Sequence, residues 1–269
     1  MHEGCGNSRT MLKTCPICAA HASARETQLG MTPIYACSRC THRFAETTEA
    51  VTYDDLYRYG IYNQTLVEPT HAAVLNGTTL EQTHEPFFAH VAVKTAGRLL
   101  DIACGTGRFA YEASKRGWTA VGCDVSDSAL AVARASFGAS VRFESSAADG
   151  APHGPFDAVT AIEFLEHTAK PIETLASLAD RTASLGIIYL TVPNWGSRGV
   201  RTATDPAWIP PIHVQFFTKR SLREALRRVD RIDSTAVRIG FVPRITSLFP
   251  LNQFTSNQPD GLWAIAPIR

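Results

Sequence analysis

Apolar runs alternate with helix-like segments along the chain from Gly97 onward. Strands that are apolar throughout are typical of a parallel sheet covered on both faces, and strands that alternate with helices imply right-handed crossovers. The pattern therefore predicts an α/β fold built on a parallel sheet. The apolar runs occupy residues 98–103, 119–124, 140–144, 156–162 and 186–192.

The pattern changes after residue 192. Residues 195–212 form a loop with proline and tryptophan that is long enough to be functional. An amphipathic helix with a serine cap is predicted at 221–226, followed by strands at 234–241 and 262–268. Two helices are predicted before the sheet, a short one at 54–57 and a second at 85–95.

The first apolar run leads directly into a glycine turn and a helix, with the sequence LLDIACGTGRFA at residues 99–110. Gly105 and Gly107 allow the backbone to turn sharply and to approach a ligand without an intervening Cβ atom. The helix at 108–116 presents its N-terminal N–H groups at this turn. Such a strand, turn and helix predict a nucleotide-like cofactor at the carboxyl end of the sheet.

Two cofactors fit this turn, and Asp101 favours one of them. The spacing of Gly105, Gly107 and Ala110 fits a relaxed dinucleotide pattern, which on its own is a weak signal. An acid at Asp101 would repel a pyrophosphate but suits a ligand that carries an amino group and a sulfonium. Asp124 ends the second strand, where an acid can accept hydrogen bonds from both ribose hydroxyls of either cofactor.

The turn resembles motif I of the class I S-adenosylmethionine (SAM) methyltransferases, D/E-x-G-x-G-x-G. Alanine stands at the first glycine, position 103, where its small side chain should be tolerated. The resemblance covers about residues 90–269 and implies a Rossmann-like, seven-stranded sheet of order 3-2-1-4-5-7-6 that ends in a hairpin with one antiparallel strand. It also implies that the residues after the third strand hold the adenine. The residues expected to bind SAM are Asp101, Ala103, Gly105, Gly107, Asp124, Ala148, Asp149 and Glu163.

The length and charge of the chain limit its domain content and its classes of binding partner. The chain has 269 residues, enough for one large α/β domain and a small appendage. Its formal net charge of +1 provides no overall field that would favour nucleic acid or an anionic membrane. No apolar run approaches the roughly 20 residues that span a bilayer, and the N-terminus lacks a signal-peptide apolar region. We therefore expect a cytoplasmic protein.

Four of the seven cysteines have the spacing of metal ligands. Cys15 and Cys18 form one CxxC pair, and Cys37 and Cys40 form a second. Each pair places two thiolates at the tip of a tight knuckle, and two knuckles complete a tetrahedral zinc site with no open position. The alternative is four unrelated buried thiols. We expect a structural zinc ribbon over residues 1–48.

Residues 49–95 are rich in aromatic side chains. By resemblance, this helical segment closes over the cofactor and shapes the substrate pocket ahead of a SAM-binding domain at 96–269. The alternative is that its tyrosines only pack the ribbon on the catalytic domain. Three residues are expected to contact the substrate: Tyr57, Tyr62 and Asn194.

A second metal site is predicted after the fourth strand. A helix that begins at Glu163 would place Glu163, Glu166 and His167 on one face, and His213 arrives from the long loop after the fifth strand. Two carboxylates and two imidazoles can hold a divalent ion with positions left open for substrate oxygens. Such an ion lowers the pKa of a substrate hydroxyl and orients it for attack on the sulfonium methyl.

This set resembles the ExxEH and distal histidine of the small-RNA 3′-end 2′-O-methyltransferases, and related ExxEH sequences occur in ubiquinone-pathway O-methyltransferases. The same residues can also act without a metal. Glu163 then only orients the substrate, and His167 lies in the core or at a helix end. In that alternative, His167 or His213 is the general base.

Three functions are compatible with these motifs. Methyltransferases with this ribbon and ExxEH core recur in polysaccharide, deoxysugar and secondary-metabolite pathways, which favours methyl transfer to oxygen or nitrogen of a small polar metabolite. The second function is an rRNA or tRNA methyltransferase whose ribbon grips RNA, although the arginine clusters at 198–201 and 223–231 are modest. The third is an NAD-binding oxidoreductase or a non-catalytic binding module.

Overall fold

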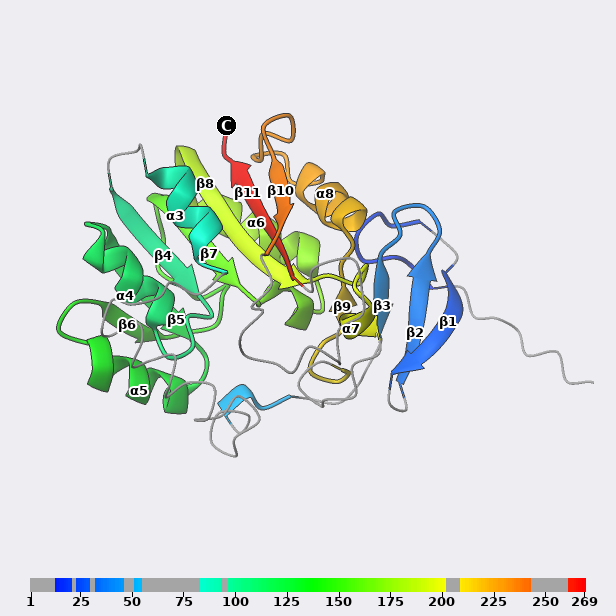
Figure 1. Ribbon diagram of the computed structural model, residues 1–269, viewed down its shortest axis with the longest axis horizontal. Coiled ribbons are helices and arrows are strands. Elements are labelled where there is room, and N and C mark those ends of the chain that lie inside the picture. Colours follow the sequence, from blue (N-terminus) through cyan, green and yellow to red (C-terminus); the bar gives the residue numbers. More distant parts are fainter. Residues whose placement is uncertain are drawn as a thin grey trace, which may run out of the picture.

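A large mixed sheet lies at the centre of the computed structural model, and a small sheet lies at one side (Figure 1). The structure describes residues 13–20, 23–29, 32–45, 51–54, 83–92, 96–201, 209–242 and 261–269. Among these residues, no helix has the length and apolar composition that crossing a membrane requires.

The large sheet has seven strands in the order β10-β11-β8-β7-β4-β5-β6. Counted along the chain within this sheet, the order is 3-2-1-4-5-7-6, as predicted. β11 is antiparallel to both neighbours, whereas the other five strands from β8 to β6 pair in parallel, which brings their carboxyl ends to one edge. The strands are β4 (Arg98–Ile102), β5 (Thr119–Asp124), β6 (Arg142–Ser145), β7 (Phe156–Ile162), β8 (Thr182–Pro193), β10 (Arg238–Phe241) and β11 (Gly261–Pro267).

Helices cover both faces of this sheet. One face packs against α3 (Glu85–Val91), α4 (Arg108–Lys115) and α5 (Asp127–Phe137) through an aromatic core centred on Phe87 and Phe109. The other face packs against α6 (Pro171–Arg181) and α8 (Lys219–Arg227). Because both faces are covered, the central strands are apolar on both sides, which is the pattern that predicted them.

The small sheet joins the N-terminal segment to the large domain. Its order is β1-β2-β3-β9, and all its pairs are antiparallel. The strands are β1 (Ser23–Leu29), β2 (Thr32–Cys37), β3 (Arg43–Ala45) and β9 (Gln215–Phe216). The pairing of β9 with β3 was not predicted, because a strand of two residues leaves no periodic pattern.

Local hydrogen bonds move some boundaries from their predicted positions. α8 is capped by Thr218, whose hydroxyl accepts from the Ser221 N–H at 3.1 Å, so the prediction of a serine cap is wrong. β10 starts at residue 238 because the N–H groups of Thr235 and Ala236 bond to Asp233 in a turn. β8 extends back to Thr182, ahead of the predicted start at residue 186.

Two residues at the carboxyl edge of the sheet have left-handed backbone conformations. Ala103 follows β4 with φ of 55°, and Glu163 follows the neighbouring β7 with φ of 48°. A side chain with a Cβ atom disfavours this region, which glycine enters freely. Ala103 therefore stands at a position where the backbone geometry itself suits glycine.

We expect Ala103→Gly to stabilise the protein. Relief of the left-handed strain outweighs the extra entropy of glycine in the unfolded chain, for a gain of up to about 1 kcal/mol in the free energy of unfolding. Urea titration measures this gain. The control is Ala131→Gly, at an exposed position inside α5, which should lose about 1 kcal/mol. A similar loss in both variants would contradict the account of strain.

Candidate functional site

The glycine turn after β4 is shaped by packing as well as by conformation. Gly105 and Gly107 have φ of 52° and 80°, and Gly107 is the N-cap of α4. A Cβ atom on Gly107 would lie 2.5 Å from the ring of Phe143 on β6 and 3.0 Å from the Cβ atom of Ala133 on α5. Gly107 is therefore needed to seat the turn against its neighbours.

Asp124 at the end of β5 holds this turn in place. One of its carboxylate oxygens accepts the N–H of Gly105 at 2.8 Å, and the other accepts the N–H of Ser126 at 2.9 Å. A carboxylate has about four lone-pair positions, so both oxygens can still accept ribose hydroxyls. Burial raises the pKa of Asp124, against the opposing effect of these backbone bonds.

Asp101 lies inside the sheet beneath the turn. It is buried, and its carboxylate accepts a 2.6 Å hydrogen bond from the hydroxyl of Thr160 on β7. Burial, with a smaller effect from the charge of Asp124, raises the pKa of Asp101 to about 7. Such a carboxylate gains most from a cationic partner, because a nearby positive charge offsets the cost of its dehydration.

The residues expected around the adenine follow β6. Ala148 is half-buried and packs on the core. Asp149 is exposed, and its carboxylate accepts the N–H of Gly150 at 2.9 Å. The carbonyl of Asp149 accepts from Arg181 of α6, which joins this loop to the opposite face of the sheet.

The structure brings together three of the four residues of the predicted second metal site. One ligand atom from each of Glu166, His167 and His213 lies within 4.8 Å of the others. The ring centroids of His167 and His213 are 4.6 Å apart. Glu166 is completely buried, and neither of its carboxylate oxygens has a hydrogen-bond partner within the described ranges.

The helix predicted from Glu163 is wrong. The chain instead forms a 3₁₀ turn, η1 (Leu165–His167). Glu163 lies before this turn, directly after the end of β7. The N–H of Glu163 donates to the carbonyl of Thr191 on β8 at 3.1 Å, which holds Glu163 at the sheet edge. Glu163 therefore lies outside the compact group, although its charge is close enough to raise the pKa of Glu166.

Burial controls the ionisation of this cluster. It raises the pKa of Glu166 well above its ordinary value, with a further contribution from the charge of Glu163. Burial also lowers the pKa of His167 to about 4, and burial together with His167 lowers that of His213 to about 3. Both imidazoles are consequently neutral near pH 7, the form in which histidine binds metals.

Hydrogen bonds position both histidines. Nδ1 of His167 lies 3.0 Å from the carbonyl of Ile212, an arrangement in which Nδ1–H donates and Nε2 carries the free lone pair. The residue after His213 is held from two sides. The N–H of Val214 donates to the carbonyl of Glu166 at 2.9 Å, and its carbonyl accepts the N–H of Ala45 in β3 at 2.9 Å.

The four predicted cysteine ligands converge in two similar knuckles. Sγ of Cys15 lies 3.6 Å from that of Cys40, and Sγ of Cys18 lies 3.5 Å from that of Cys37. In each knuckle, the residue after the second cysteine has a left-handed conformation, Ala19 with φ of 55° and Thr41 with φ of 64°.

The cysteine cluster is buried and its thiols interact directly. All four cysteines lie in the core shared with α8. A hydrogen bond with the Cys40 thiol lowers the pKa of Cys15 to about 5, and the same bond with burial raises the pKa of Cys40. This group is chemically suited to exchange its thiol protons for a metal ion.

Two residues that sequence reasoning did not single out lie beside the site. The ring of Tyr53 meets that of His167 edge-on, with centroids 5.6 Å apart. The carboxylate of Asp54 accepts the hydroxyl of Ser126 at 3.0 Å and the N–H of Ser128 at 2.8 Å, at the start of α5. The dipeptide Tyr53-Asp54 thus contacts both the segment after β7 and the segment after β5, at the carboxyl edge of the sheet. These contacts are long-range and have no local sequence signal.

Of the three residues expected to contact the substrate, the structure describes one. Tyr57 and Tyr62 lie outside the described residues. Asn194 is buried at the end of β8, and its side-chain oxygen accepts the N–H of Gly196 at 2.9 Å. Its carboxamide therefore helps to form the turn after β8.

Comparisons of sequence relate the chain to methyltransferases. A family model described as "Methyltransferase domain" matches residues 62–230. The chain is 35% identical over 103 residues to a ubiquinone biosynthesis O-methyltransferase of Aromatoleum aromaticum, over 36% of this chain and 44% of the relative. The corresponding enzyme of Caulobacter sp. is 32% identical over 127 residues, or 42% of this chain and 50% of the relative. The chain thus spans about half the length of these curated relatives.

Solved structures show the same fold. A possible histamine N-methyltransferase of Thermotoga maritima has a TM-score of 0.56 at 15% identity, covering 78% of this chain and 99% of the other. A magnesium protoporphyrin IX methyltransferase of Synechocystis has a TM-score of 0.55 at 16% identity, covering 79% of this chain and 93% of the other. The chain therefore belongs to the methyltransferase domain family and has the class I SAM-dependent methyltransferase fold.

Proposed function

We propose that the protein transfers the methyl group of SAM to an oxygen atom of a small polar acceptor. The family match favours SAM over a dinucleotide, and the names of the curated relatives favour oxygen over nitrogen. One observation supports the location of the reaction centre. Glu166 is a fully buried carboxylate without a hydrogen-bond partner in the described structure, and it lies beside two neutral histidines.

In this proposal, the turn and its two acids bind the cofactor. The buried carboxylate of Asp101 has lost most of its hydration, and the ammonium group of SAM would offset this cost. Asp124 accepts the ribose hydroxyls with its remaining lone pairs. Gly105 allows the backbone to approach the ligand, and Ala103 completes the same turn. Ala148 and Asp149 lie beside the adenine, and Glu163 approaches the cofactor from the end of β7.

Glu166, His167 and His213 are proposed to hold a divalent ion. The donor set fits, because a carboxylate with orphaned oxygens and two neutral imidazoles offer three ligand atoms at short range and leave other positions for oxygens of the acceptor. Such an ion would lower the pKa of an acceptor hydroxyl. Glu163, from the end of β7, can contact the acceptor or serve as a fourth ligand.

The residues of the chain then determine the course of transfer. Asp101 and Asp124 fix the two ends of the cofactor and so direct its sulfonium methyl toward the edge near β7. The acceptor hydroxyl releases its proton to solvent, and its oxygen attacks this methyl carbon. The C–S bond breaks with its electron pair left on sulfur, so S-adenosylhomocysteine is the second product. His167 and His213 orient the acceptor oxygen in line with the C–S bond.

The metal-free alternative assigns the proton to His167 or His213. Their pKa values of about 4 and about 3 make both imidazoles weak bases near pH 7, below the range in which a general base is efficient. Burial leaves their ability to act as ligands intact. The lowered pKa values, together with the short distances between the ligand atoms of Glu166, His167 and His213, therefore favour a ligand role over proton abstraction.

We also propose a structural zinc ion bound by Cys15, Cys18, Cys37 and Cys40. Sulfur atoms in a tetrahedral site with Zn–S bonds of about 2.3 Å lie roughly 3.8 Å apart, close to the separations of 3.5 and 3.6 Å between these cysteines. The cluster is buried, which excludes a substrate position. Its role is to stabilise the two knuckles.

Gly105→Val should abolish binding of S-adenosylhomocysteine. Valine is strained at φ of 52° and would intrude on the cofactor. Calorimetry measures binding, and Ala103→Gly in the same turn should keep its affinity. Unchanged affinity in Gly105→Val would refute the proposed cofactor site.

Binding of S-adenosylhomocysteine should also depend on Asp101. Since its pKa is about 7, the carboxyl is protonated below that pH and must lose its proton to meet the ligand ammonium. Affinity should level off above pH 7, while the ligand ammonium keeps its proton, and fall about tenfold per pH unit below it. Asp101→Asn should bind weakly at all pH values without this slope, and a retained slope would contradict the assignment.

Mn²⁺ should bind the Glu166 cluster, with an affinity that rises with pH. Metal displaces the proton that the raised pKa of Glu166 retains, so affinity increases up to about tenfold per pH unit until Glu166 is ionised. Glu166→Gln should lose Mn²⁺ without losing S-adenosylhomocysteine, as measured by electron paramagnetic resonance and calorimetry. The matched control is Glu173→Gln, at an exposed position of α6, which should bind Mn²⁺ normally. Equal Mn²⁺ binding by wild type and Glu166→Gln would refute the site.

Purified protein should contain about one tightly held zinc ion per chain. Cys37→Ser should lose zinc and lower the melting temperature, because metal binding contributes directly to folding. Elemental analysis and calorimetry provide the measurements. Cys104→Ser, outside the knuckles, should retain the zinc, whereas a folded, zinc-free wild type with four titratable thiols would exclude it.

A further inference from the structure

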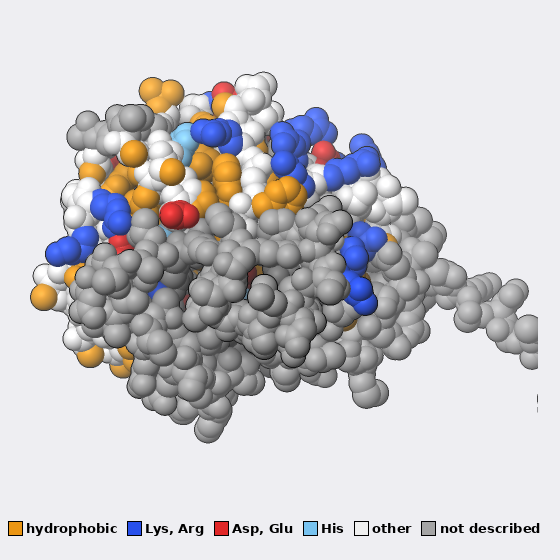
Figure 2. Space-filling view, viewed as in Figure 1, with side chains coloured by type: hydrophobic (Ala, Val, Ile, Leu, Met, Phe, Trp, Pro, Cys, Tyr) orange, Lys and Arg blue, Asp and Glu red, His pale blue; other side chains and the backbone are white. Residues whose placement is uncertain are grey.

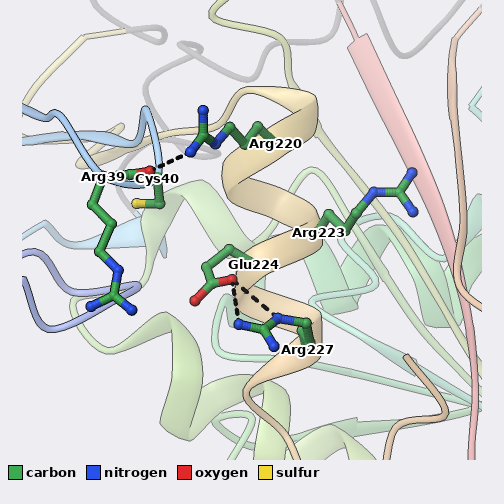
Figure 3. Close-up of a pocket in the computed structure, with 6 residues that line it drawn as sticks. All are labelled: Arg39, Cys40, Arg220, Arg223, Glu224 and Arg227. Atoms are coloured by element: carbon green, nitrogen blue, oxygen red, sulfur yellow. Dashed lines mark hydrogen bonds and ion pairs between the residues drawn. The ribbon is translucent and has the colours of Figure 1, made fainter. Parts of the chain in front are cut away.

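A basic hollow lies where the second cysteine knuckle meets α8 (Figure 3). Its volume is about 260 Å³. Figure 3 shows Arg39 descending from the knuckle, with Arg220, Glu224 and Arg227 on the facing side of α8, while Arg223 extends past the helix. The lining residues are Arg39, Cys40, Arg220, Arg223, Glu224 and Arg227.

Positive charge is in excess around this hollow. The lining residues include four arginines and one carboxylate, which gives them a net charge of +3. Three of these arginines, Arg39, Arg220 and Arg227, lie on the side where the knuckle and α8 face each other (Figure 3). That carboxylate, Glu224, is already engaged, with Arg227 at 3.2 Å and Arg228 at 3.1 Å. Within the described part of the chain, Arg39 and Arg223 form no ion pair. Figure 2 shows Lys and Arg side chains gathered over the position of α8.

The two walls of the hollow are joined by direct bonds. The guanidinium of Arg220 donates to the carbonyl of Arg39 at 2.7 Å, and the hydroxyls of Thr41 and Thr218 lie 2.8 Å apart. The guanidinium of Arg228 donates to the carbonyl of Cys18 at 3.0 Å. The arginines therefore project from a preorganised frame, which reduces the entropy lost when a ligand binds.

The geometry points to a binding site for the diphosphate group of a small soluble ligand. Guanidinium groups match the oxygens of phosphate with paired N–H donors, and each such charge-assisted contact is stronger than one between neutral groups. A volume of about 260 Å³ is equivalent to roughly nine water molecules, enough for two linked phosphates but small for a whole drug-sized ligand. Nothing in this assignment depends on methyl transfer or on the metal at Glu166.

Calorimetry with inorganic pyrophosphate and full-length, zinc-loaded protein tests this site. At an ionic strength of about 0.15 M, where long-range attraction is screened, we expect saturable binding by the wild type. Arg39→Gln should weaken binding about fivefold or more, and Arg39→Gln with Arg220→Gln should remove it. Glu224→Gln should tighten binding, a change that damage to the fold would not produce.

The control removes two exposed charges elsewhere. Lys115→Gln with Arg142→Gln lowers the net charge equally, on α4 and at the start of β6, and should leave affinity within about twofold of the wild type. Equal weakening in this control would show that overall charge, and not the hollow, holds pyrophosphate.

A second titration uses a short single-stranded RNA as the alternative source of phosphates. Tighter binding of RNA than of pyrophosphate, lost in the same arginine variants and with steep salt dependence, would overturn the small-ligand assignment. Absence of pyrophosphate binding, or binding that Arg39→Gln with Arg220→Gln leaves unchanged, would overturn the site itself.

Discussion

The two backbone groups of Val214 join the parts of this protein. Its N–H donates to the carbonyl of Glu166 in η1, and its carbonyl accepts the N–H of Ala45 in the small sheet. The next residue repeats the connection with its side chain, since Gln215 donates to the carbonyl of Thr168 at 3.0 Å and lies 2.8 Å from Nε2 of the buried His42. Because His213 directly precedes these two residues, the small sheet with its cysteine knuckles determines where His213 lies. The N-terminal segment is therefore part of the frame of the candidate reaction centre.

Each of the two candidate ligand sites contains a buried carboxyl group. Asp101 beneath the glycine turn and Glu166 beside the histidines are both removed from water, and burial raises the pKa of each. A carboxylate in this situation either keeps its proton or acquires a cation, since the charged form has lost most of its hydration. In our proposal the cation is the ammonium of SAM at the first site and a divalent metal at the second.

Backbone strain is concentrated at the same edge of the sheet. Ala103 and Glu163 follow adjacent parallel strands, and both have left-handed conformations without being glycine. The surrounding hydrogen bonds hold them there, including the bond from Gly105 to Asp124 and the two bonds from Glu163 N–H to the carbonyl and hydroxyl of Thr191. Strain of this kind persists where the surrounding structure overdetermines it, and it is frequent at functional sites.

The sequence by itself determined the large sheet, the glycine turn with Asp101 and Asp124, and the convergence of four cysteines, because each depends on a local period or a fixed spacing. Only the tertiary structure decided the arrangement of the second site. Glu163 leaves the group because the chain turns after β7 to bond with Thr191, and no local preference encodes that bond. Tyr53, Thr160 and Gln215 reach the site from distant parts of the chain, and β9 is too short to have a pattern. Contacts between residues far apart in sequence depend on how layers pack, which a single sequence does not display.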